Sequence, residues 1–534
     1  MNKKNKFFLA IDVGTGSGRA AVYDDHGDEL GFHAQEWHHF KDPRYPGSME
    51  FDTEGNWSII CNCIKGAINK SGLHSSQIDA ISATGMRLGT VFYDRDGEVL
   101  FACTNTDTRA DKQTSELIKQ GLAPKIYEID GEWPGIGGPL VQLLWLRENE
   151  PAKFERIAHV TMLTDWVLYK LSGTYSVDPS CAGTSGMFDG RKRTWSEEIA
   201  DWLGIPMEFL APVNEPGTVI GKITSKAADE TCLKIGLPVV QGGSDAGTGL
   251  AGVAAVQSGK SYIGTGSFWN ASIITDQMII DPKARAKILP HIIPGLWQLE
   301  GVCFYAGYMV RWFRDAFCQE EIRLAKRLGI DVYKILDEQA AQVPAGANDV
   351  QVSVGGVLDT KRWIVPPPTF MGWDMNDSRK SRKEVFYRAL LENAAYQIRG
   401  SFDLLYEITG IEIESSSILG GASRSSLWPK IIADVLGKPI KVPTVKEGSS
   451  LGAAMCAATG IGLYKNIAEA AMSMVSWEKI YYPKLDTKTK ELYSRKYEQW
   501  REIFSDLIHL CEKGVVPPLW KAAGVLIDEK LNID

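Results

Sequence analysis

Two short stretches of the chain carry the residue types needed to hold a phosphate group. The tetrapeptide Gly-Thr-Gly-Ser occurs twice, as Gly14, Thr15, Gly16 and Ser17 and as Gly264, Thr265, Gly266 and Ser267. Glycine lets backbone N–H groups approach a ligand closely, and the hydroxyl side chains add further donors. Asp12 precedes the first copy, where a carboxylate can hold Mg²⁺ directly or through water, and Arg19 follows it as a phosphate partner.

The residues around both copies predict strand–turn–strand hairpins. β-branched and aromatic residues flank each tetrapeptide, as in FFLAIDV before the first copy and FWNASIITD at the second. A dinucleotide-binding turn leads from a strand into a helix, so a Rossmann site is disfavoured. Gly259-Lys260-Ser261 lacks the first glycine of a P-loop, where Ala254 stands, and we reject that motif. Either copy alone is compatible with an ordinary turn. Two copies half a chain apart favour paired phosphate loops that face each other across a cleft.

Asp245 is a candidate catalytic residue. It follows an apolar strand expected at 237–241 and precedes a helix of small residues expected at 247–256, which would pack closely between domains. A strand that passes into a helix is the usual place for catalytic groups in α/β folds, and a helix N-terminus favours an ionised carboxylate. The alternative is that Asp245 only caps the helix.

Two further polar segments are candidates for ligand contacts. Asn105, Asp107 and Arg109 alternate along 103–111 and would share one face of an extended chain, unless the segment is a solvated turn. The glycine-rich turn at 420–425 follows a short strand and would let a flat ring or a phosphate lie against its backbone.

The elements that must position these residues alternate between strands and helices, which indicates an α/β fold. Thr53 is expected to cap the first helix, and Glu392 and Asn393 are expected at a surface or interface. Strands are expected near 29–37, 78–84, 91–93, 99–101, 297–304 and 416–419, and helices near 53–71, 140–149, 161–171, 307–317, 383–409 and 449–460.

Length and composition limit the class of protein. A chain of 534 residues exceeds one core, and we predict two domains, 1–256 and 257–534, with the switch at 257–259. A net charge of −8 argues against a nucleic-acid partner. The apolar run at the N-terminus is too short for a signal peptide, and no stretch predicts a membrane span. Nine scattered cysteines are expected to be reduced thiols of a cytoplasmic protein, and no H-E-x-x-H zinc motif occurs.

Taken together, these motifs resemble the FGGY family of carbohydrate kinases over nearly the whole chain. The resemblance implies two ribonuclease-H-like domains of the actin and hexokinase type, with the active site in the cleft between them. It also implies ATP and Mg²⁺, with Asp12 as the metal carboxylate and Asp245 as the base. The two tetrapeptides with Arg19 would hold the phosphates. The rest of the nucleotide would contact Gly307, Arg311, Gly421, Ala422 and Ser425.

The substrate implied by the resemblance is a small sugar-like molecule. Candidates for its orientation are Arg87, Asp107, Arg109, Phe268 and Trp269, together with Asp245. Stretches such as G-S-M-E-F-D and M-V-R-W-F-R-D-A-F-C resemble family members that phosphorylate the linear five-carbon dihydroxypentanedione of quorum sensing at its terminal hydroxyl. Those members have a glutamate where this chain has Leu88, so a pentulose or related polyol is the alternative.

Two other classes of function are compatible with the same fold. A sugar or nucleotide sensor would lack the base or the metal carboxylate, and both are present. An actin-like or chaperone-like ATPase would need no sugar site. The polar and aromatic residues of the first half suit such a site and therefore argue against this class. The oligomeric state is open between a monomer and a homodimer.

Overall fold

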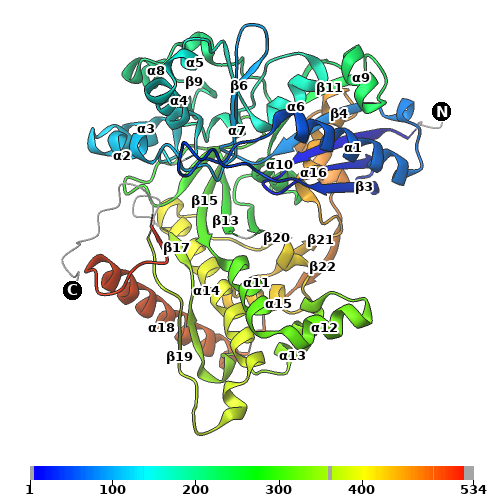
Figure 1. The fold of residues 1–534 in the computed structure, drawn as a ribbon. Coiled ribbons are helices and arrows are strands. Elements are labelled where there is room, and N and C mark those ends of the chain that lie inside the picture. The colour runs from blue at the N-terminus through cyan, green and yellow to red at the C-terminus, as the bar shows by residue number, and fades with distance from the viewer. Residues whose placement is uncertain (1–4, 136, 267, 359–363, 485, 522–534) are drawn as a thin grey trace.

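The computed structural model describes residues 5–521 except 136, 267, 359–363 and 485. Its two main β-sheets follow one another along the chain (Figure 1). The first sheet has the order β10-β11-β4-β1-β2-β3, with β1 (Phe7–Val13), β2 (Ser17–Asp24), β3 (Glu29–Glu36), β4 (Ala80–Gly85), β10 (Val219–Lys222) and β11 (Pro238–Ser244). The second has the order β14-β15-β13-β12-β20-β21-β22, with β17 paired to β15. Its strands are β12 (Ser261–Thr265), β13 (Trp269–Thr275), β14 (Lys287–Pro290), β15 (Trp297–Phe304), β17 (Gly356–Leu358), β20 (Ser416–Gly420), β21 (Ile440–Pro443) and β22 (Trp477–Tyr481).

The two sheets repeat one pairing pattern. In the first, β1 pairs antiparallel with β2 and parallel with β4, and β2 pairs antiparallel with β3. In the second, β12 pairs antiparallel with β13 and parallel with β20, and β13 pairs antiparallel with β15. The two Gly-Thr-Gly-Ser copies therefore stand at equivalent hairpin turns, β1–β2 and β12–β13. This duplication confirms the predicted α/β fold with two ribonuclease-H-like units.

Helices cover the sheets, and small accessory sheets lie beside them. The helices are α1 (Thr53–Ser71), α2 (Asp111–Lys119), α3 (Leu122–Asp130), α4 (Pro139–Asn149), α5 (Pro151–Phe154), α6 (Leu163–Ser172), α7 (Pro179–Ala182), α8 (Glu197–Leu203), α9 (Ser225–Thr231), α10 (Asp245–Gly252), α11 (Ala306–Phe317), α12 (Gln319–Leu328), α13 (Val332–Ala341), α14 (Lys383–Thr409), α15 (Trp428–Leu436), α16 (Gly448–Gly460), α17 (Ile467–Met474) and α18 (Thr487–Glu512). The remaining strands are β5 (Thr90–Tyr93), β6 (Val99–Cys103), β7 (His159–Met162), β8 (Phe188–Asp189), β9 (Thr194–Trp195), β16 (Gln351–Ser353), β18 (Ile364–Val365), β19 (Thr369–Met371) and β23 (Trp520–Lys521).

Helices α10 and α16 are exchanged between the two halves of the chain. Helix α16 lies between β21 and β22 of the second sheet in sequence, yet its apolar side chains pack against Phe8, Ala10 and other residues of the first sheet. Helix α10 follows the first sheet, and its Leu250 packs with Tyr262 and Leu419 of the second. Both helices lie side by side between the sheets (Figure 1). The boundary predicted after residue 256 separates the sheets along the chain but not these helices, and it stays a prediction.

The close packing expected of the small-residue helix at 247–256 is confirmed, although the helix itself spans Asp245–Gly252. A Cβ on Gly252 would lie 2.0 Å from the carbonyl oxygen of Gly448, and a Cβ on Gly452 would lie 2.0 Å from that of Thr248. Both distances are shorter than any side-chain contact allows, so glycine is required for the two backbones to touch.

Several local expectations are corrected by the structure. Asp52 rather than Thr53 caps α1, because its side chain accepts from the Gly55 N–H. The helix expected from residue 161 begins at Leu163, since 159–162 pair with β5 as a strand. Between that helix and β8, residues 179–182 form a helical turn capped by Asp178.

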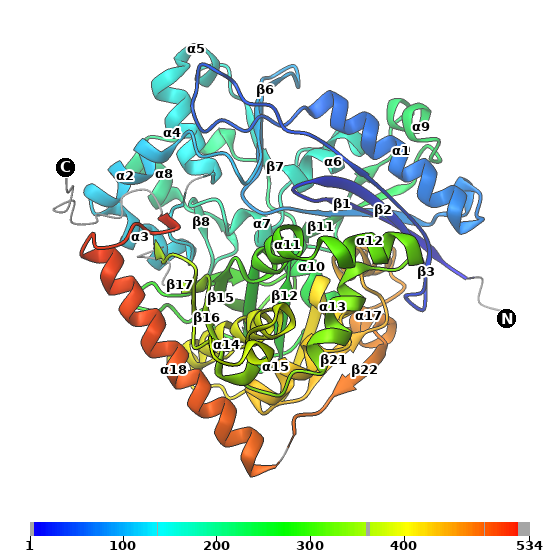
Figure 2. The same cartoon turned by 60° about the horizontal axis from the view of Figure 1, so that its bottom comes forward.

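Helix α14 has the predicted bounds, but Glu392 and Asn393 are not at the surface. They are 2% and 0% exposed, because α18 covers this side of α14 (Figure 2). Glu392 accepts from Arg388 and Tyr493, and Asn393 accepts from the Trp500 indole N–H. These partners satisfy polar groups that would otherwise be costly to bury.

We expect Gly252→Ala and Gly452→Ala to lower the melting temperature clearly. The new methyl group must push α10 and α16 apart, and overpacking of this kind costs about 1–3 kcal/mol or more. Circular dichroism against temperature measures the effect. Gly135→Ala is the matched control, because the nearest atom to its new Cβ, Trp133 O, is 3.7 Å away. Melting temperatures equal to that of the wild type would contradict the close packing of the two helices.

Candidate active site

Two adjoining cavities lie where the hairpin turns of both sheets meet the start of α10. The first, which we call the Arg87 cavity, has a volume of about 600 Å³. The second, the Arg311 cavity, has a volume of about 910 Å³. The two cavities share Asp12, Arg19, Thr265, Trp269 and Asp245 among their lining residues. A cleft lined from both halves of the chain was predicted, and the structure contains one.

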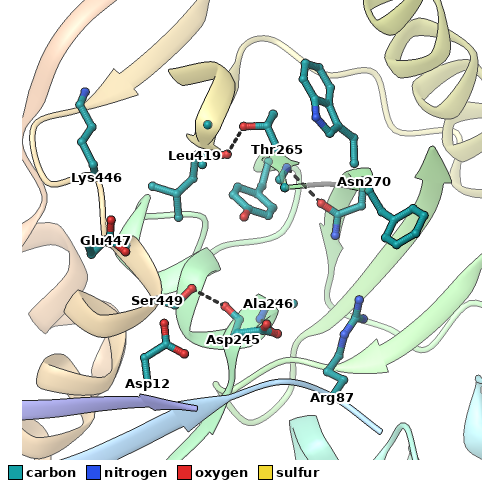
Figure 3. A pocket seen from close by; sticks show the side chains of 18 of the residues that line it. Asp12, Arg87, Asp245, Ala246, Thr265, Asn270, Leu419, Lys446, Glu447 and Ser449 are labelled. Atoms are coloured by element: carbon teal, nitrogen blue, oxygen red, sulfur yellow. Dashed lines mark hydrogen bonds between the residues drawn. The ribbon is translucent and has the colours of Figure 1, made fainter. Parts of the chain in front are cut away.

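Asp245 lies at the first residue of α10, directly after β11. The Ser244 side chain caps this helix by accepting from the Gly247 N–H, so capping is not the role of Asp245. The carboxylate of Asp245 accepts from the Ala246 N–H at 2.7 Å and faces the Arg87 cavity (Figure 3). Burial raises the pKa of Asp245, and the nearby Arg87 only partly offsets this. Loss of hydration therefore outweighs the effects of Arg87 and of the Ala246 N–H, which both favour the ionised carboxylate.

Asp12 and Arg19 face each other across the β1–β2 hairpin. Their backbones are paired in the hairpin register, and Arg19 Nη1 donates to Asp12 Oδ2 at 3.1 Å. Burial raises the pKa of Asp12 to about 6; Arg19 lowers it, whereas the charges of Asp245 and Glu447 raise it further. This gathering of buried negative charge is the environment that a cation would stabilise.

The donor set at Asp12 fits a hydrated Mg²⁺ ion. In the part of the chain that the structure describes, no three His, Cys, Asp or Glu side chains come together as a protein-only metal site. Mg²⁺ characteristically takes one or two carboxylates, several waters and phosphate oxygens, so such a cluster is not required. Asp12 supplies the carboxylate, and the adjacent glycine turns leave room for phosphate.

The predicted nucleotide residues converge on the Arg311 cavity. Its lining includes Gly14, Thr15, Gly16, Gly266, Gly307, Arg311, Gly421, Ala422 and Ser425. Gly264 lines the Arg87 cavity instead. Gly307 must be glycine, because a Cβ there would lie 2.0 Å from the carbonyl oxygen of Gly266 in the second turn.

Some hydroxyl groups predicted to bind phosphate or nucleotide are already used within the protein. Thr265 Oγ1 donates to Leu419 O and accepts from the Ala422 N–H, which ties β12 to the 420–425 turn (Figure 3). Ser425 Oγ donates to Asp337. Ser17 accepts from Arg19 Nε and does not line either cavity, and Ser267 lies outside the described residues.

The predicted substrate residues divide into two groups. Arg87, Phe268 and Trp269 line the Arg87 cavity. Asp107 and Arg109 do not line either cavity. They form a buried ion pair at 2.6 Å, and Arg109 also pairs with Glu50 and stacks over Phe101 and Trp145.

The segment 103–111 turns rather than extends, so its polar side chains do not share one face. Asp107 accepts from the backbone N–H of Met49 and from Gln142. Asn105 instead contacts the first hairpin turn through Thr15 Oγ1 at 3.2 Å. Asn105 therefore contacts the first hairpin turn, and Asp107 and Arg109 form a buried ion pair. The three side chains do not form the predicted binding face.

Sequence reasoning missed several charged residues of the cleft. Glu300, Lys446 and Glu447 line the Arg87 cavity, and Asp337 lines the Arg311 cavity. Burial raises the pKa of Asp337 to about 6. Glu300 had one available signal, because it is the single charged residue of the otherwise uncharged strand WQLEGVCF. A lone charge in a buried strand needs a partner, and such residues mark functional sites.

Comparison with known proteins agrees with this geometry. A model of the N-terminal domain of the FGGY family of carbohydrate kinases matches residues 7–252, and a model of its C-terminal domain matches residues 259–461. The chain is 40% identical over 522 residues to an autoinducer-2 kinase of Yersinia pestis bv. Antiqua (strain Angola), which covers 97% of this chain and 98% of that protein.

Solved structures share the fold. A xylulose kinase from Rhodospirillum rubrum superposes with a TM-score of 0.81 at 24% identity, covering 95% of this chain and 99% of that one. A ligand-bound xylulose kinase from Lactobacillus acidophilus gives 0.82 at 21% identity, covering 94% and 98%. Among the described residues, no helix has the length and apolar character needed to cross a membrane. With both family models matched in order along one chain, this protein is a carbohydrate kinase of the FGGY family.

Proposed function

We propose that the protein transfers the γ-phosphate of ATP to the terminal hydroxyl of linear dihydroxypentanedione, the precursor of autoinducer-2. The observation that carries this proposal is the 40% identity to autoinducer-2 kinases over 97% of the chain. The Arg87 cavity supports it, because its volume of about 600 Å³ suits a small substrate. A pentulose or related polyol is the other substrate class that the fold accommodates.

The chemistry depends mainly on positioning and on charge neutralisation. Phosphoryl transfer passes through a loose transition state in which the protein performs little covalent chemistry. The nucleotide lies in the Arg311 cavity, and the two glycine turns direct backbone N–H groups at its phosphates. Asp12 would hold Mg²⁺, which would supply positive charge to the phosphate oxygens.

Asp245 accepts the proton of the substrate hydroxyl as its oxygen attacks the γ-phosphate. The attacking O–H bond breaks, the new O–P bond forms and ADP leaves. The raised pKa of Asp245 makes it a stronger base than an exposed carboxylate. Its place in both cavities puts it where the sugar and the triphosphate meet.

The substrate is tested by ADP release in a coupled assay with purified protein. The panel contains dihydroxypentanedione, D-xylulose, D-ribulose, the alditols D-arabitol and ribitol, and glycerol. We expect dihydroxypentanedione to give the highest kcat/KM. A higher value for a pentulose would assign the alternative, and ADP release that does not depend on any added compound would indicate an ATPase instead.

Asp245→Asn should lower kcat by about a hundredfold or more, because the amide cannot accept the proton. ATP binding, measured by calorimetry, should be retained. The melting temperature should be equal to or above that of the wild type. Burial raises the pKa of Asp245, so the ionised carboxylate destabilises the folded state at neutral pH, and the amide removes that cost. Near-normal turnover would remove Asp245 from the role of base.

The acid limb of the pH profile of kcat/KM should depend on the Mg²⁺ concentration. Asp12 has a pKa of about 6, so it becomes protonated as the pH falls through that value, and kcat/KM should fall with it. A proton and a metal ion compete for the same carboxylate. Raising the Mg²⁺ concentration should therefore move the acid limb to lower pH. Profiles at two Mg²⁺ concentrations measure this, and an identical acid limb in both would contradict Asp12 as the metal carboxylate.

A further inference from the structure

Glu300 is a buried carboxylate of the Arg87 cavity that the proposed chemistry does not use. It lies on β15 in the second half of the chain and is 1% exposed. Its Oε1 accepts from Arg87 Nη2 at 3.0 Å. Arg87 follows β4 of the first half, so this ion pair joins the two halves across the cleft.

The other carboxylate oxygen of Glu300 is also occupied. Oε2 accepts from Asn270 Nδ2 at 2.7 Å and from Gln298 Nε2 at 3.1 Å. Asn270 in turn accepts from the Gly264 N–H at 3.0 Å through its own oxygen, at the start of the second glycine turn (Figure 3). A continuous set of hydrogen bonds therefore runs from Arg87 to the strand that carries that turn.

Glu300 stays ionised within this set. Although burial raises its pKa, Arg87 and Lys287 lower it by more, so that the pKa lies below the usual range. Lys287 is the cross-strand neighbour of Glu300 on β14, and it pairs with Glu132 of the first half. Positive and negative charges thus alternate across the cleft, which is the arrangement that makes buried charges tolerable.

Arg87 has donors left over. Its Nη1 is buried and has no hydrogen-bond partner in the described part of the chain, although the side chain reaches into the cavity (Figure 3). A buried donor without a partner is unfavourable, and a ligand oxygen that reaches the guanidinium can supply one. Leu88 offers no carboxylate beside it, and both oxygens of Glu300 are engaged. Neither neighbour of Arg87 therefore offers a free acceptor to a ligand.

We infer that Glu300 is a positioning residue that holds Arg87 from across the cleft, so that the guanidinium donates to a carbonyl oxygen of the substrate. A carbonyl oxygen only accepts hydrogen bonds, whereas an alditol hydroxyl that accepts from Arg87 also needs an acceptor for its own proton, which neither Leu88 nor Glu300 offers. The inference rests on the proposed kinase function and narrows its substrate class to keto compounds. It favours dihydroxypentanedione and ketopentoses over alditols and glycerol.

Glu300→Gln is the variant that tests this role. A glutamine at this place has one acceptor and one NH₂ group. If its oxygen faces Arg87, its NH₂ group meets the donors of Asn270 and Gln298. Asn270 cannot easily turn over, because its oxygen is used by the Gly264 N–H. The substitution thus breaks either the hydrogen bond to Arg87 or those to Asn270 and Gln298, with almost no change in the shape of the side chain.

The control is Glu132→Gln. Glu132 forms the neighbouring buried ion pair between the two halves but does not line either cavity. Both variants remove one buried negative charge next to Lys287. A general effect of charge removal on stability should therefore appear in both variants. Only Glu300 contacts Arg87, so an effect on the position of Arg87 should appear in Glu300→Gln alone.

Steady-state kinetics with dihydroxypentanedione, D-xylulose and D-arabitol measure the outcome. The wild type should prefer the keto compounds to the alditol. In Glu300→Gln, the KM for the keto compound should rise by about tenfold or more, the range expected for loss of a charge-assisted hydrogen bond. The preference over the alditol should shrink, while the KM for ATP stays within about twofold. Glu132→Gln should keep the wild-type preference.

Several results would overturn the inference. These are a wild type that phosphorylates D-arabitol as well as D-xylulose, a KM unchanged in Glu300→Gln, and equal effects in Glu132→Gln. A crystal structure of Glu300→Gln in which Arg87 keeps its place would also overturn it, and that result needs no substrate. Failure of the proposed function is a separate result, since it shows as poor turnover of dihydroxypentanedione by the wild type whatever the variants do.

Discussion

The contact between α10 and α16 is the constraint on which the cleft depends. Gly252 and Gly452 let the two backbones touch, and each helix packs on the sheet of the opposite half. The first residue of α10 is Asp245, and the hydroxyl of Ser449 in α16 donates to the Asp245 carbonyl oxygen at 2.8 Å. The helix that joins the two halves therefore also places Asp245, the proposed base, between them. A larger side chain at this contact would move Asp245 as well as the two sheets.

Burial of this site sets its electrostatics. Asp12 and Asp245 each lose hydration in the cleft, which raises both pKa values, and the charge of Asp245 raises the pKa of Asp12 further. Arg19 and Arg87 compensate only in part. The folded protein thus holds carboxylates in a state that is costly without a cation and a substrate. An energetic cost of this kind is typical of catalytic sites, where charged groups are arranged to stabilise the transition state rather than the folded protein.

Features encoded locally could be predicted from the sequence. The hairpins around both glycine turns and the bounds of α14 follow from residue type and spacing over a few positions. Contacts between distant segments could not be predicted. Glu392 and Asn393 have the pattern of surface residues, and only the packing of α18 over α14 makes them core residues. Asp107 and Arg109 alternate as strand residues do, but a turn and the rings of Phe101 and Trp145 bring them into a buried pair.

The same limit applies to the site around Leu88. Seen along the chain, a glutamate missing after Arg87 is a lost partner for the substrate, and it leaves the arginine without a neighbouring carboxylate. In space, Glu300 supplies a carboxylate to Arg87 from the opposite half of the chain. The two arrangements are not equivalent. A glutamate on the same loop could accept from a substrate hydroxyl, whereas Glu300 uses both of its oxygens within the protein. The cavity therefore keeps its arginine but gains no free acceptor from Glu300, and the proposed base Asp245 would receive the proton of the hydroxyl that is phosphorylated.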